Sequence, residues 1–90
     1  MDTNSPVGVD DVKDVLVETL GLEDRGDSLT ADTRLFGALP ELDSLAVVEL
    51  IVALERRFGI EVPPEDVTAE TFETLGALTE FIAGQVRQSA

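Results

Sequence analysis

The sequence contains no cysteine, histidine, tryptophan or tyrosine. Without cysteine and histidine, the chain has no disulfide, thiolate nucleophile or imidazole base, and it lacks the usual zinc and haem ligands. Basic residues are also scarce, because 6 Lys and Arg stand against 19 Asp and Glu, for a formal charge of -13. Nucleic acids and anionic membranes attract basic proteins. We therefore expect no catalytic site, no metal site, no nucleic acid or membrane partner, and partner proteins with basic surfaces.

Long apolar runs are absent as well. The densest run, Leu45 to Leu54, contains Glu49 and is far shorter than the ~20 apolar residues that span a bilayer. The N-terminal segment has neither the basic nor the apolar region of a secretory signal. These features predict a soluble, cytoplasmic protein. Its 90 residues suit a single domain, which we expect at 9–88 after a flexible leader at 1–8, in a monomeric protein.

The spacing of apolar residues predicts an all-α fold, a small four-helix bundle with three long helices and a short one. The first helix is expected to start at a cap on Asp10 or Asp11 and to stop at Gly21. The following segment, 21–42, is rich in leucine and should pack across the bundle rather than form a solvated linker. A short third helix is expected over Pro64–Val67, because proline suits a first helical position.

The second helix is predicted from Ser44 through Phe58 to Gly59, and the last helix after a cap on Thr74. The second helix carries two apolar stripes. The inner stripe, expected to face the core, consists of Val47, Leu50, Ile51, Leu54 and Phe58. The second stripe is a candidate docking face, with acids around it that include Glu41, unless the long loop covers it; the docking residues are Leu45, Val48, Glu49, Val52 and Glu55.

A tripeptide, Asp43-Ser44-Leu45, stands where the loop turns into this second helix. Further motifs follow it in order, namely Val48-Glu49-Leu50, Ala53-Leu54-Glu55, Phe58, Val62-Pro63 with acids after it, and Thr74-Leu75-Gly76. Together they resemble a free-standing acyl carrier protein. The resemblance covers roughly Leu35 to Val86, and the first helix fits it in position and pattern only.

This resemblance implies that Ser44 is modified on its hydroxyl by 4'-phosphopantetheine, which a magnesium-dependent phosphopantetheinyl transferase takes from coenzyme A. The chain would then hold acyl groups as thioesters and deliver them to biosynthetic enzymes without being an enzyme itself. Asp43 would help to position the transferase, its magnesium ion or the serine, and the space between the second, third and fourth helices would shelter the acyl chain. The start of a helix suits a phosphodiester, because it offers unpaired N–H groups and a partial positive charge.

Alternatives remain open at this stage. Asp43 or Ser44 can be an ordinary helix cap in an unmodified acidic helical adaptor that binds a protein partner through the second helix. The same tripeptide also occurs at Asp27-Ser28-Leu29, but no apolar helix follows it, so Ser28 is interpreted as a turn residue. A metal-binding module is disfavoured, because no calcium loop of the Asp-x-Asp-x-Asp-Gly type is present.

Three residues depart from the family pattern. Ala46 stands where many members have an acidic residue, and Arg56-Arg57 replace acids near the end of the second helix. Arginines there would repel a basic docking patch, unless they pair with acids of this chain such as Glu49 or Asp66. The departures favour a specialised pathway, such as a polyketide, lipid-modification or surface-polysaccharide system, over primary fatty acid biosynthesis.

Overall fold

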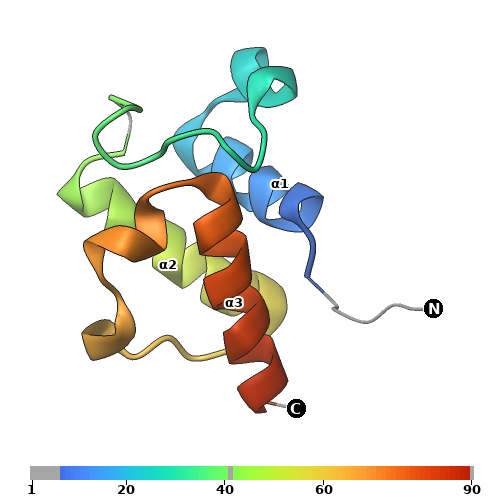
Figure 1. The fold of residues 1–90 in the computed structure, drawn as a ribbon, viewed down its shortest axis with the longest axis vertical. Helices are drawn as coiled ribbons and strands as arrows, with labels where there is room; N and C mark the ends of the chain where they lie inside the picture. Colours follow the sequence, from blue (N-terminus) through green and yellow to red (C-terminus); the bar gives the residue numbers. More distant parts are fainter. Residues whose placement is uncertain (1–6, 41, 90) are drawn as a thin grey trace.

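Three long helices form the frame of the fold in the computed structural model, which describes residues 7–40 and 42–89 (Figure 1): α1 Val9–Leu20, α2 Ser44–Phe58 and α3 Leu75–Ser89. Three short 3-10 helices connect them: η1 Glu23–Ser28, η2 Pro64–Asp66 and η3 Ala69–Phe72. Helix α1 packs against both α2 and α3. The predicted helical class is confirmed. The predicted short helix is correct only in part, because it is a single 3-10 turn that a second one follows. Within the described ranges, no helix is long and apolar enough to cross a membrane.

The start of α1 differs from the prediction. Gly8 is the N-cap, and Asp11 lies inside the first turn, where its carboxylate accepts a hydrogen bond of 3.0 Å from the Gly8 N–H. The predicted caps, Asp10 and Asp11, are therefore wrong, because the carboxylate closes the turn from within the helix. Residue Val7 is buried in the core. The other residues of the predicted leader, 1–6, lie outside the described part of the chain.

The remaining helix ends follow the prediction. Gly21 and Gly59 adopt left-handed conformations, with φ of 69° and 65°, and they end α1 and α2. This conformation costs glycine little because it has no side chain. At the start of α3, the Thr74 hydroxyl oxygen accepts a hydrogen bond of 3.0 Å from the Ala77 N–H, which confirms the predicted cap.

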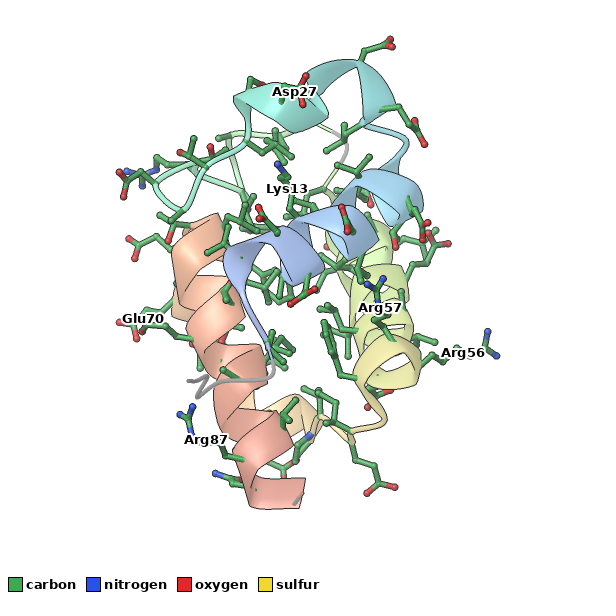
Figure 2. All side chains as sticks on the ribbon, turned by 90° about the vertical axis from the view of Figure 1, so that its right-hand side faces the viewer. Lys13, Asp27, Arg56, Arg57, Glu70 and Arg87 are labelled. Carbon is green, nitrogen blue, oxygen red and sulfur yellow. The ribbon has the colours of Figure 1, made fainter. Side chains whose placement is uncertain are left out.

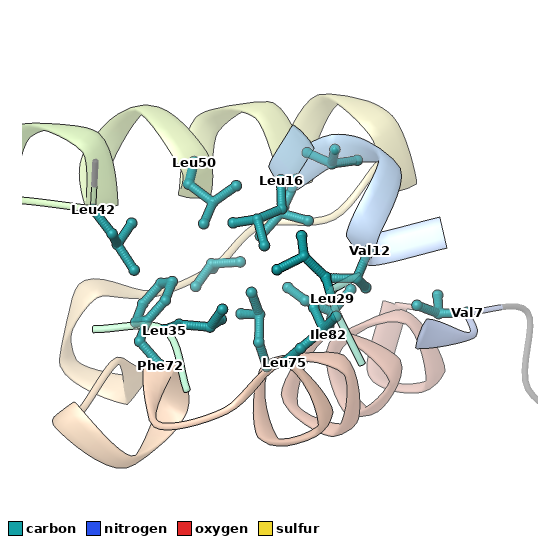
Figure 3. Packing of buried hydrophobic residues seen from close by; sticks show 14 of the residues in the cluster. Val7, Val12, Leu16, Leu29, Leu35, Leu42, Leu50, Phe72, Leu75 and Ile82 are labelled. Carbon is teal, nitrogen blue, oxygen red and sulfur yellow. The ribbon is translucent and has the colours of Figure 1, made fainter. Parts of the chain in front are cut away.

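The core is built mainly from leucine, valine and isoleucine. Leu16 of α1, Leu50 of α2 and Leu75 of α3 point toward one another in the interior (Figure 3). Of the inner stripe of α2, Leu50 and Leu54 are fully buried, whereas the other three residues are partly buried around the core. Each full burial of a leucine contributes about 1.5–3 kcal/mol. The predicted orientation of α2 is confirmed.

The long loop packs across the bundle, as predicted. Its buried residues are Leu22, Leu29, Leu35 and Leu42. The loop also pairs with the start of α3 through backbone hydrogen bonds of 2.8–3.1 Å, in which the Leu35 N–H donates to the Glu73 carbonyl, and the Leu75 and Gly76 N–H groups donate to carbonyls of the loop. These bonds satisfy two N–H groups that the helix itself leaves without partners. The loop therefore fixes the position of α3.

Candidate functional site

The first turn of α2 is capped by Asp43. This residue has an extended backbone, and its Oδ1 atom accepts a hydrogen bond of 2.8 Å from the N–H of Ala46. Its carbonyl oxygen accepts the first bond of the helical type, 2.9 Å from the N–H of Val47. A capping carboxylate is also favourable at the positive end of a helix. Asp43 therefore caps the helix, and the Ser44 side chain takes no part in the cap.

Ser44 is the first residue of α2, and it is exposed. Within the described ranges, its hydroxyl makes no hydrogen bond, and neither do the N–H groups of Ser44 and Leu45. The hydroxyl is thus accessible to another protein, and the two N–H groups are available to a phosphate oxygen. These features fit a phosphodiester on the Ser44 oxygen.

The second copy of the tripeptide lies in a different setting. Ser28 is the last residue of η1, and the chain continues from it into an extended loop toward Ala31. Its successor Leu29 is buried, whereas the Leu45 side chain after Ser44 is 67% exposed. Ser28 therefore lies at no α-helix start and has no exposed apolar side chain directly after it.

The outer face of α2 carries exposed apolar side chains. Leu45, Val48 and Val52 are 67%, 57% and 44% exposed, and the neighbouring Glu49 is exposed as well. The possibility that the long loop covers this face is therefore wrong. The loop buries its own leucines elsewhere and leaves the outer face uncovered. We call Leu45, Val48, Glu49 and Val52 the docking face.

Two other residues of α2 bear on the predicted docking surface. Glu55 Oε2 accepts a hydrogen bond of 2.8 Å from the N–H of Val62, so this carboxylate also holds the segment after α2. Ala46 is buried beneath the first turn. The Ala46 side chain is therefore not part of the exposed outer face of α2. Glu41 lies outside the described residues.

Two apolar grooves run between α2 and the segment that contains η2 and η3. The Val48 groove, about 290 Å³, is lined by Val48, Ile51, Val52, Glu55, Val62 and Val67. The Phe36 groove, about 270 Å³, is lined by Phe36, Val47, Thr68, Ala69 and Phe72. A larger hollow of about 500 Å³ has three glutamates in its wall and does not suit an apolar chain. Residues of α3 line neither apolar groove; the lining comes from α2, the segment after it and Phe36 of the long loop.

Two comparisons with known proteins agree with each other. Residues 10–82 match the model of a family described by its phosphopantetheine attachment site. The fold is similar to the solution NMR structure of a holo acyl carrier protein from Nitrosomonas europaea, with a TM-score of 0.80 and 41% sequence identity over 91% of this chain and 96% of that one. The family match includes α2 and the residues before it.

Proposed function

The chain belongs to the acyl carrier proteins with a phosphopantetheine attachment site, and we propose that Ser44 is the residue to which 4'-phosphopantetheine is attached. The observation that carries this proposal is the division of roles at the start of α2. Asp43 caps the helix, so the exposed hydroxyl of Ser44 is not needed for the fold. The family supplies the cofactor, and the local geometry supports Ser44 as the residue that carries it.

The attachment step is a phosphoryl transfer. The Ser44 hydroxyl oxygen forms a bond to the phosphorus that bears the pantetheine in coenzyme A. The bond between the two phosphates of coenzyme A breaks, and adenosine 3',5'-bisphosphate leaves with the electron pair. The hydroxyl proton passes to a base of the transferase or to water. In this step Asp43 orients Ser44 by fixing the first turn of α2.

When bound, 4'-phosphopantetheine supplies a terminal thiol on which acyl groups are held as thioesters. The residues of this chain bind the acyl group and present it to partner enzymes; they do not catalyse its reactions. The N–H groups of Ser44 and Leu45 would hold an oxygen of the phosphate, the docking face would contact the partner enzymes, and the Val48 and Phe36 grooves would receive apolar parts of the cargo. Both grooves border α2, so cargo is kept close to the residue that carries it.

The pathway we propose is a specialised one, such as a polyketide or lipid-modification system, rather than primary fatty acid synthesis. Support comes from Arg56 and Arg57, which place positive charge near the end of α2. Basic docking patches of ordinary carrier partners would be repelled there.

The attachment site is tested by the intact mass of the chain after incubation with coenzyme A, magnesium and a broad-specificity phosphopantetheinyl transferase. The wild-type chain should gain one phosphopantetheine, and Ser44→Ala should gain none. The matched control is Ser28→Ala, which removes the serine of the second tripeptide and should be modified like the wild type. Modification of Ser44→Ala would overturn the proposal. No gain on the wild-type chain, with a transferase proven active on another carrier, would favour the unmodified adaptor.

A further inference from the structure

We propose that Arg56 determines which enzymes this carrier accepts, by contacting a carboxylate on the partner surface that binds the docking face. The inference rests on the proposed function, because it assumes that partners approach Ser44 along the outer side of α2. It adds to the proposed function the kind of surface that a partner enzyme must have. A fitting partner has an apolar patch for the valines and an acidic residue at one end of that patch.

Helix geometry places Arg56 on the docking face. It follows Val52 by four residues and Val48 by eight, and residues separated by four positions are neighbours on one side of a helix. Arg57 is turned about 100° further around the axis. The two side chains point in different directions from the end of α2 (Figure 2), with Arg56 extending away from the rest of the fold. Only the first of the two arginines therefore extends the docking face.

The positive charge of Arg56 is not neutralised within the described part of the chain. The salt bridge found there joins Lys13 and Asp10 at 4.0 Å, and Arg56 makes no ion pair with Glu49, Asp66 or another acid. The possibility that the arginines pair with Glu49, Asp66 or another acid is thus wrong for the described residues. Arg57 has a partial partner, because its guanidinium lies 5.9 Å from the centroid of the Phe58 ring.

A guanidinium at the edge of an apolar patch discriminates between partners by charge. It binds a carboxylate through paired hydrogen bonds. A lysine or arginine of the partner in the same place is repelled, and the repulsion grows when the apolar contact excludes water. Arg56 lies twelve residues after Ser44, which corresponds to about 18 Å along the helix. The matching acid on the partner should therefore lie about this far from the point where Ser44 enters its active site.

The test uses the same broad-specificity transferase, together with versions in which single basic residues around its serine-binding site are changed to glutamate. Kinetics of loading are measured for the wild-type chain, Arg56→Glu and Arg57→Glu. The two chain variants have the same net charge, and each differs from the wild type at a single position. One of the altered transferases should have a KM for the wild-type chain about 3- to 10-fold lower than the unaltered transferase has. Its KM for Arg56→Glu should be about 3- to 10-fold higher, with kcat little changed for both chains. The same transferase should not distinguish Arg57→Glu from the wild type.

Equal KM changes for the two chain variants would show that only net charge matters, and would overturn the assignment of Arg56. Absence of any transferase position coupled to Arg56 would overturn it too. In both cases loading of Ser44 at saturating concentration would continue, so the proposed function would stand. Failure to load the wild-type chain would refute the proposed function and this inference together. Thermal unfolding of the variants checks that neither change alters the fold.

Discussion

Replacing Asp43 with alanine should lower the free energy of unfolding by about 1 kcal/mol, whereas replacing Ser44 with alanine should change it by less than about 0.5 kcal/mol. The difference follows from the first turn of α2. Asp43→Ala removes the acceptor 2.8 Å from the Ala46 N–H, in a partly buried position. Ser44→Ala removes an exposed hydroxyl without a hydrogen bond in the described structure.

The energies come from known capping effects. Loss of an N-cap acceptor costs about 0.5–2 kcal/mol, and the interaction of a carboxylate with the helix dipole adds about 0.3–1 kcal/mol. For a domain of this size, 1 kcal/mol corresponds to a shift of about 4–8 °C in Tm. Asp43→Asn is the matched control. It keeps an oxygen acceptor but loses the charge, so its loss of stability should be smaller than that of the alanine variant.

The assay is urea unfolding followed by circular dichroism, with the three variants and the wild type in the apo form. Midpoints should order as wild type and Ser44→Ala, then Asp43→Asn, then Asp43→Ala, with a common m-value. A loss for Ser44→Ala that equals or exceeds the loss for Asp43→Ala would mean that the serine is the cap. The argument that its hydroxyl is free for modification would then fail.

Two further predictions concern the whole fold. Gly76→Ala should cost about 1–3 kcal/mol, because an added Cβ would lie 3.0 Å from the Ala31 carbonyl oxygen in the loop that pairs with α3. Gly84→Ala in the same helix should instead raise the free energy of unfolding in urea by about 0.5–1 kcal/mol, since its Cβ would meet only the end of the Arg87 side chain at 4.0 Å. A loss of stability for Gly84→Ala as large as that for Gly76→Ala would refute the clash with Ala31. With a net charge of -13, Tm should rise with added salt or divalent cations, and a Tm independent of ionic strength would contradict self-repulsion as a limit on stability.

Local sequence rules account for the parts of the fold that were predicted correctly. The bounds of α2, the glycine stops at Gly21 and Gly59 and the cap at Thr74 each depend on residues within one or two turns. The cap of α1 was also open to a local argument. Gly8 and Asp11 have the spacing of a capping box, in which the third helical residue reaches back to the cap, so this spacing places the acid inside the first turn and not at the cap.

The features that were missed depend on contacts between distant parts of the chain. Pairing of residues 31–36 with 72–76 joins segments about forty positions apart, and no apolar period marks it. The exposure of the docking face is a similar case, because an apolar stripe has the same spacing whether a loop covers it or not. Only the path of the long loop decides whether the stripe is covered or exposed, and this path depends on where Leu29 and Leu35 are buried.

The candidate serine could be chosen from the sequence because four turns of apolar helix follow Ser44 and none follows Ser28. The sequence could not show which of two adjacent polar residues caps that helix, since aspartate and serine are equally good caps. This distinction is the one that matters for function. A serine that caps would lose a stabilising bond on modification, whereas a serine beside a separate cap can be modified at no cost to the helix.

The two sides of helix α2 thus have different tasks: one stabilises the fold, and the other carries the residues that we assign to function. The side toward the core holds Leu50 and Leu54, whose replacement would leave cavities. The residues that we assign to modification and partner choice, Ser44, Val48 and Arg56, are all exposed. Changes at exposed positions rarely alter stability by more than about 0.5 kcal/mol. Single substitutions on the outer face can therefore change partner specificity, the role we propose for Arg56, while the fold that presents the serine stays the same.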